Sequence, residues 1–214
     1  MPRFGEPLTH VHGGVGSGGQ LDWDSIFSDA VHGHFSNVEG GFLPMWPHQI
    51  SSGRYYCAPP IDRLTGQIAP GANVLWLTPA LFPEAVTIDR LCENVLVNAA
   101  GAKLRLGYYT DVNGVPTALV VDSGELDAST TGEKAAVVAA TLGPGVLWRA
   151  VFCNHATVEL PCYNAGTPVG GASRSGAVDN LSLSAALTFA ALPATAPTMT
   201  GEQNRGFAVV FRIA

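Results

Sequence analysis

The sequence predicts an all-β protein, a jelly-roll-like β-sandwich that follows a short, mostly irregular N-terminal stem with one short helix. Three observations support this fold class. Short apolar segments recur through residues 44–214 between turn residues, with no helical pattern between them, which is typical of a sandwich or jelly roll. Charged residues make up 13% of the 214-residue chain, too few for the surface of a helical bundle. The 25 glycines and 15 prolines can end many short strands.

Residues 1–43 differ in composition from the rest and are predicted to form a stem that anchors the chain and joins copies of it. They hold four of the six histidines and a glycine-rich stretch at 13–19. One amphipathic stripe predicts a helix of roughly ten residues, too short to be stable alone. We therefore expect its apolar side chains to pack against symmetry-related copies; they are Trp23, Ile26, Phe27, Ala30 and Val31.

Residues 44–214 are predicted to form the β-sandwich domain. Alternating apolar residues indicate strands in ten ranges: 53–58, 73–77, 85–97, 103–109, 117–121, 134–141, 146–154, 157–163, 181–189 and 206–213. Asn113-Gly114 predicts a two-residue hairpin turn, because both positions accept a positive φ. A second sharp turn is predicted at 141–145, where Gly143-Pro144-Gly145 precedes a strand.

The charge and apolar patterns exclude several classes of partner. Lys and Arg number 11 against 17 Asp and Glu, a net charge of −6, whereas a nucleic-acid binder would carry a basic stripe. The uncharged stretch 181–201 is interrupted by Ser, Thr and Pro and is interpreted as a strand followed by a loop, so no membrane insertion is expected. Residues 1–6 do not lead into an apolar core, so we expect synthesis in the cytoplasm without a signal peptide.

Two His-x-His motifs are the candidate metal ligands. They are His10-Val11-His12 and His32-Gly33-His34. In an extended segment the side chains of residues i and i+2 point to the same side. Three chains around an axis would supply six imidazoles from one motif, a suitable octahedral site for iron or another transition metal. The alternatives are a solvated loop, or stacked histidines that bind only an anion or water.

Neither a nucleotide site nor a catalytic site is predicted. Gly14, Gly16 and Gly19 match a dinucleotide-binding pattern, but no βαβ unit surrounds them, so a linker is the better interpretation. Cys153 and His155 could form a nucleophilic pair. No acidic residue is placed to orient the imidazole, which favours a packed thiol beside an exposed histidine. The four cysteines lack CxxC spacing and are expected to be free.

Aromatic side chains are the candidate ligand-binding residues. A pyranose ring can stack on an exposed Trp or Tyr. The candidates are Trp46, Tyr55, Tyr56, Tyr109 and Tyr163. Aromatic residues are only 8% of the chain, so the alternative is that the core or a trimer interface takes most of them.

One long segment resembles tailed-bacteriophage fibre and virion-surface proteins. Residues 103–116, KLRLGYYTDVNGVP, match the family's strand of the type arlGiY followed by an NG-x-P hairpin. The resemblance continues through 119–125 and 129–132 to LGPGVLWRA at 142–150, and 86–91 fits the strand that usually precedes it. It covers about residues 50–160. Leu147 stands where the family often has Tyr, and residues 164–205 match nothing in the pattern.

The resemblance implies a β-sandwich virion component without catalytic residues. Residues 28–35 are similar to the Asp/His segments of trimeric fibre stems, in which His-x-His motifs can hold an axial iron. We therefore expect a non-enzymatic virion protein, a homotrimer that serves as a tail fibre, head fibre, spike or capsid decoration. Its N-terminal segment would bind other virion proteins, and its sandwich would contact the host surface, including surface glycans. The alternatives are a carbohydrate-binding module and a virion-associated polysaccharide depolymerase.

Overall fold

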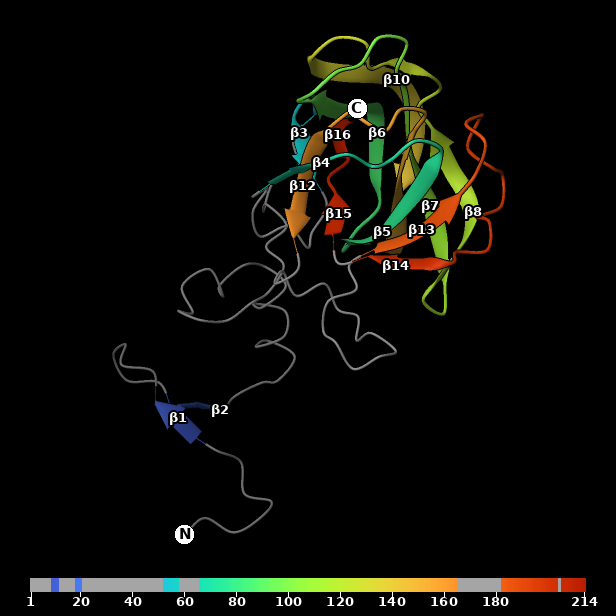
Figure 1. The fold of residues 1–214 in the computed structure, drawn as a ribbon. Helices are drawn as coiled ribbons and strands as arrows, with labels where there is room; N and C mark the ends of the chain where they lie inside the picture. The colour runs from blue at the N-terminus through green and yellow to red at the C-terminus, as the bar shows by residue number, and fades with distance from the viewer. Residues whose placement is uncertain (1–8, 12–17, 21–51, 58–65, 165–181, 204) are drawn as a thin grey trace. The chain divides into compact units, whose positions relative to one another are not determined.

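The computed structural model describes residues 9–11, 18–20, 52–57, 66–164, 182–203 and 205–214 (Figure 1). These residues form antiparallel strands grouped in several sheets and contain no helix, which confirms the predicted all-β class. The chain divides into two compact units, Met1–His48 and Gln49–Ala214. Within the described ranges, no helix has the length and apolar character needed to cross a membrane.

The first unit contains one described strand pair. Strand β1 (Thr9–Val11) pairs with β2 (Gly18–Gln20), and His10 lies opposite Gly19. The other histidines of the predicted metal site, His12, His32 and His34, lie outside the described residues. So do all five residues of the predicted stem helix: Trp23, Ile26, Phe27, Ala30 and Val31.

The largest sheet of the second unit has seven strands in the order β14-β13-β5-β11-β7-β8, with β9 also paired to β7. The strands are β5 (Val74–Phe82), β7 (Lys103–Val112), β8 (Val115–Asp122), β9 (Leu126–Asp127), β11 (Gly145–Cys153), β13 (Ser182–Ala186) and β14 (Gly201–Gln203).

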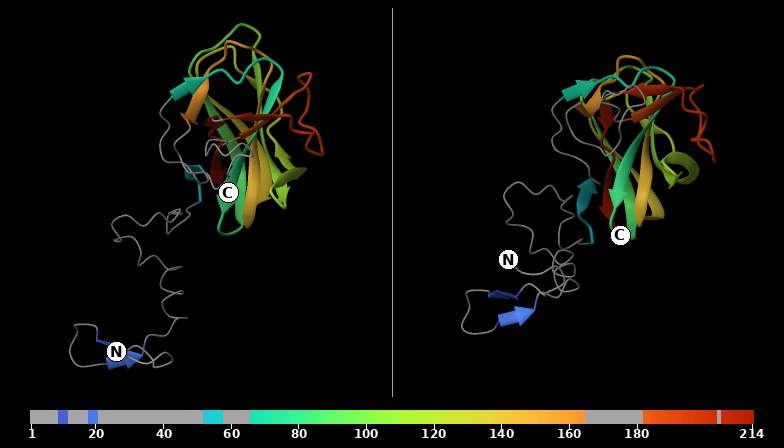
Figure 2. Two further views of the ribbon diagram at one scale, coloured as in Figure 1. Left: turned by 60° about the horizontal axis from the view of Figure 1, so that its bottom comes forward. Right: turned by 90° about the horizontal axis from the view of Figure 1, so that it is seen from below.

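A four-stranded sheet has the order β10-β6-β16-β3 and consists of β3 (Tyr55–Cys57), β6 (Val86–Val95), β10 (Gly132–Leu142) and β16 (Val210–Ile213). A three-stranded sheet joins β15 (Arg205–Phe207), β12 (Leu160–Asn164) and β4 (Gly66–Ile68). The C-terminal strand β16 lies beside β6 although the two are far apart in the sequence (Figures 1 and 2).

Each strand range predicted from alternation overlaps a strand of the structure, whereas five short strands were not predicted: β1, β2, β4, β9 and β14. The predicted hairpin turn joins β7 to β8, and both Asn113 and Gly114 have a positive φ, 55° and 79°. Asp111 adds to this turn, because its carboxylate accepts hydrogen bonds from the Gly114 N–H and the Trp148 indole. Local turn chemistry therefore fixes this hairpin.

The inner faces of the two large sheets meet in an aromatic core. The Phe82 ring of β5 packs edge-on against Tyr108 of β7 and contacts Phe211 of β16, with ring centroids 5.7 and 5.6 Å apart. The Tyr108 hydroxyl donates to the carbonyl oxygen of Val209, so the polar end of this buried ring is satisfied.

A second apolar core covers the opposite face of the seven-stranded sheet. Residues 187–200, here called the strap, run across this face and pack on alternate residues of its strands. Phe189 of the strap lies 5.0 Å from Phe152 of β11, measured between ring centroids. Leu192 lies so close to Gly107 that a Cβ atom there would be 2.5 Å from its Cδ1. Because Gly107 has no side chain, Leu192 of the strap can pack directly against the sheet at this point.

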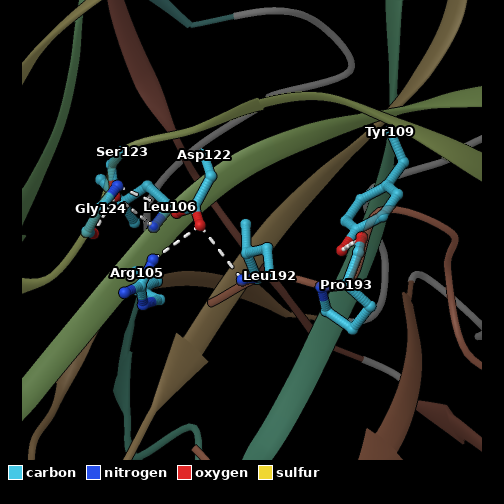
Figure 3. A network of polar contacts seen from close by, with 8 residues as sticks. All are labelled: Arg105, Leu106, Tyr109, Asp122, Ser123, Gly124, Leu192 and Pro193. Carbon is cyan, nitrogen blue, oxygen red and sulfur yellow. Dashed lines mark hydrogen bonds and ion pairs between the residues drawn. The ribbon is translucent and has the colours of Figure 1, made fainter. Parts of the chain in front are cut away.

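Polar contacts hold the strap to the sheet (Figure 3). The Asp122 carboxylate accepts hydrogen bonds from the Arg105 guanidinium at 2.6 Å, the Leu192 N–H at 3.1 Å and the Gly124 N–H at 2.9 Å. The Tyr109 hydroxyl donates to the Pro193 carbonyl oxygen at 2.9 Å. One carboxylate thus joins the β7–β8 pair and the strap.

Candidate binding surface on the four-stranded sheet

The five aromatic candidates differ in their surroundings. Tyr55 is the exposed one among those whose side chains are described, with 47% of its surface accessible. Tyr56 is half-buried against Phe211, and Tyr109 is fully buried with its hydroxyl bonded to Pro193, so Tyr109 presents no ring face to a ligand. Tyr163 belongs to β12, but its side chain lies outside the described part, as does all of Trp46.

Tyr55 belongs to a row of residues that crosses all four strands of its sheet. In the strand register, Tyr55 of β3 is opposite Arg212 of β16, Arg212 is opposite Arg90 of β6, and Arg90 is opposite Val137 of β10. Directly opposed residues on neighbouring strands share a face of the sheet. We call this set, Tyr55, Arg212, Arg90 and Val137, the surface row.

A bulge in β6 adds Asp89 to the surface row. The register passes from Arg212 opposite Arg90 to Ile213 opposite Ile88, so Asp89 and Arg90 together face a single partner residue. A β-bulge of this kind breaks the strict alternation and lets two consecutive side chains reach the same side. Asp89 accordingly reaches Arg212, which donates from Nε at 2.8 Å and from Nη2 to the two carboxylate oxygens.

The Asp89–Arg212 pair is the fixed electrostatic part of the surface. The hydrogen bonds from Arg212 lower the pKa of Asp89, and the bond to Asp89 in turn raises the pKa of Arg212. The Arg212 guanidinium also lies over the Tyr55 ring, 5.9 Å from its centroid, within cation–π range. Asp89 and Arg212 therefore stay charged at neutral pH, and Arg212 orients the tyrosine.

Arg90 is differently placed. It is partly exposed and forms no hydrogen bond or ion pair through its side chain with another residue that the structure describes, and its Nε atom is buried without a partner among them. Its positive charge contributes to lowering the pKa of Asp89. Since the side chain is partly exposed, the terminal amino groups of the guanidinium, rather than the buried Nε, are the donors that a group from outside can reach.

Val137 ends the surface row at the edge strand β10. With 76% of its surface exposed, it is a large apolar side chain in water. Its neighbours on the same strand, Ala135 and Ala139, are also exposed. Across the four strands the surface row thus presents an aromatic ring, then charged groups, then an apolar side chain at the edge, a mixture common in interaction surfaces.

The described residues show no arrangement of side chains suited to catalysis or to metal binding. The Cys153 thiol contacts the backbone of His155, whose Nδ1 instead faces Thr157, and burial raises the pKa of Cys153. Glu93, a carboxyl group whose pKa burial raises well above its usual range, lies in the core near Arg149 and is 3% exposed. Among the residues that the structure describes, no three His, Cys, Asp or Glu side chains are grouped to hold a metal.

Sequence reasoning singled out Tyr55 but missed Asp89, Arg90, Val137 and Arg212. No short motif joins them, since they come from three strands and meet only through register. The Asp89-Arg90 pair within an alternating apolar strand is the one local signal, because it interrupts the expected alternation. No known family model and no curated protein matches the chain.

Proposed function

We propose that the chain is a non-enzymatic structural protein of a tailed-bacteriophage virion that contacts the host surface through its β domain. It would act as a tail or head fibre, a spike or a capsid decoration, with a jelly-roll-like sandwich as the outward domain. The observation that carries the contact role is the surface row, in which an exposed aromatic ring lies beside charged groups on one sheet face. The resemblance of residues 103–150 to fibre proteins supports the virion setting.

The chemistry of the row favours binding over catalysis. Asp89 is held ionised by Arg212, whereas glycoside cleavage needs a carboxylic acid that can donate a proton. The carboxyl group with a raised pKa, Glu93, is enclosed in the core. These properties argue against a depolymerase centred on the described acids and for a surface that recognises without reacting.

The stem would multiply this contact. Three copies joined through residues 1–43 would present three surface rows, and linked weak sites bind far more tightly than single ones. The same segment would attach the trimer to other virion proteins. Iron or another transition metal held by His10, His12, His32 and His34 would cross-link the three chains on their axis.

Native mass spectrometry of the purified full chain tests the assembly, with and without a chelator. We expect the mass of three chains, plus metal that the chelator removes. A metal-free trimer would retain the fibre proposal and remove the metal site. A monomer would overturn the trimeric stem.

Retention of the fluorescently labelled chain on a panel of encapsulated and uncapsulated bacterial strains tests the contact role. We expect retention on some strains and its loss in Tyr55→Ala. Equal retention of Tyr55→Ala on every bound strain, or no retention on any strain, would contradict the assigned role of the surface row.

A carbohydrate-binding module is the second candidate function, and the 47% exposure of Tyr55 is the observation that favours it. It would use the same surface without a stem-based trimer. A monomeric chain that still binds glycans through Tyr55 would identify this alternative.

A further inference from the structure

We propose that the surface row binds an acidic saccharide, with a sugar carboxylate on Arg90 and a pyranose ring against Tyr55. This inference rests on the proposed contact with a host surface and names its ligand class. It follows from three properties of the row: a guanidinium that pairs with no other described residue, an exposed oriented ring, and a local charge opposite in sign to that of the whole chain.

The local charge is positive. Arg90 and Arg212 face a single carboxylate, Asp89, in a chain whose net charge is −6. The next acid on β10, Glu133, is opposite Asn94 and lies four residues along the strand from Val137. An anion that approaches this face therefore meets an attractive patch within an otherwise repulsive molecule.

Arg90 is the group that can hold the anion. Arg212 is committed to Asp89 through two hydrogen bonds, whereas Arg90 has no such partner among the described residues. A guanidinium forms two parallel hydrogen bonds to a carboxylate, a geometry that a lysine cannot reproduce. Because the Nε atom of Arg90 is buried, a carboxylate would bind the two terminal amino groups of the guanidinium.

Tyr55 supplies the second contact and indicates a sugar. It lies two strands from Arg90 across β16, a distance of roughly 10 Å at ordinary strand spacing. A short acidic oligosaccharide can bridge these positions, with one ring stacked on Tyr55 and the carboxylate of another on Arg90. Asp89, next to Arg90 on β6, can accept a sugar hydroxyl and would repel dense polyanions such as a nucleic-acid backbone.

Binding to immobilised acidic polymers tests the proposal. The probes are polygalacturonate, polyglucuronate and polysialic acid, each with its carboxyl-reduced neutral counterpart. We expect the full chain to bind at least one acidic polymer about tenfold more tightly than its reduced form, the magnitude of a charge-assisted hydrogen bond.

Variants assign the contacts. Arg90→Gln should lower the affinity for the acidic polymer about tenfold and abolish the preference for it over the reduced form. Arg90→Lys should retain part of that affinity. Tyr55→Ala should weaken binding about fivefold while Tyr55→Phe retains it. Asp89→Asn should strengthen binding, because it removes the local negative charge and releases Arg212.

Lys103→Gln is the matched control, since it removes one positive charge from the other sheet, where Lys103 pairs with Glu125. It should leave binding unchanged. Thermal unfolding of each variant separates a lost contact from a lost fold, and the opposite effects expected of Arg90→Gln and Asp89→Asn distinguish recognition from a structural role.

Three outcomes would overturn the ligand class: equal binding of every acidic polymer and its reduced form, equal effects of Arg90→Gln and Lys103→Gln, or equally tight binding of duplex DNA. If cells still retain the chain through Tyr55 in any of these cases, the contact role survives without the acidic ligand. Absence of binding to both cells and polymers would overturn both.

Discussion

Glu93 lies on the inner face of β6, and its carboxyl group is buried in the core. One of its oxygens accepts a hydrogen bond from the Asn94 N–H, and the other has no hydrogen-bond partner among the described residues. Arg149 from β11 and Cys57 from β3 are the charged and titratable groups nearby, and Arg149 donates toward the Cys57 sulfur at 3.5 Å. Burial outweighs the attraction of Arg149, so the pKa of Glu93 is raised.

We expect Glu93→Gln to alter how stability depends on pH. The folded protein binds the Glu93 proton more tightly than the unfolded chain does. The free energy of unfolding therefore falls as the pH rises from the ordinary glutamic acid pKa toward the raised folded value. Gln has no such titration, so the variant should gain stability relative to the native chain between pH 4 and 8.

Thermal unfolding of both proteins over this pH range measures the difference. Glu133→Gln, a change of the same type at an exposed site on β10, is the control. If the stability difference between the native chain and Glu93→Gln did not change with pH, the conclusion that burial raises the pKa of Glu93 would be wrong.

The Asp122 carboxylate is one of several polar attachments of the strap, and it is the one that also binds an arginine of the sheet. Asp122 ends β8 and connects Arg105 on β7 with the Leu192 N–H of the strap. The side chains of Asp122 and Arg105 are 18% and 16% exposed, so water screens their attraction only in part. Leu192 and Phe189 make apolar contacts with the sheet, the backbone of 194–196 pairs with β8, and Asp122 adds a side-chain hydrogen bond at Leu192.

We expect Asp122→Ala to destabilise the protein by about 2–3 kcal/mol, because it leaves both the Arg105 guanidinium and the Leu192 amide without this partner. Hydrogen exchange should accelerate at residues 187–200 before it does so in β5 or β11. Asp127→Ala is the control, because the exposed Asp127 bonds only within its own turn to Ser129. Uniform acceleration across both sheets would show that Asp122 does not act on the strap in particular.

Two apolar cores share the seven-stranded sheet in the second unit, one toward the four-stranded sheet and one beneath the strap. The four cysteines are distributed over β3, β6, β11 and β12. Burial raises the pKa of Cys57 and of Cys92 to about 11 and also raises that of Cys153. Because thiolates are the reactive form, these thiols report on the integrity of the whole domain.

We expect the native chain to react slowly with a disulfide reagent such as Ellman's reagent at pH 8, and the unfolded chain to yield four thiols at once. The reaction should follow a single cooperative transition with increasing guanidinium chloride, since Cys92, Cys153 and Cys162 are all buried. Fast reaction of these three buried thiols in native protein would contradict the packing described for the two sheets.

Local patterns were sufficient for the strands and the hairpin. Alternation in segments such as 86–91 and 103–109 follows from the two-residue period of a strand, and Asn113-Gly114 follows from the φ values that a tight turn demands. The short strands β1, β2, β4, β9 and β14 were missed because a segment of two or three residues is too short to show an alternation of apolar and polar residues. The strap was interpreted as part strand and part loop, and nothing local indicated that it covers a sheet.

The sequence by itself determined the all-β class and the main strands. Only the tertiary structure decided that Tyr55, Arg90, Val137 and Arg212 form one row and that Tyr109 lies buried beside the strap. The reason is physical. Alternation tells which residues share a face of one strand, but the partners and register of that strand depend on packing across the whole chain. At Asp89 a bulge changes even the local alternation.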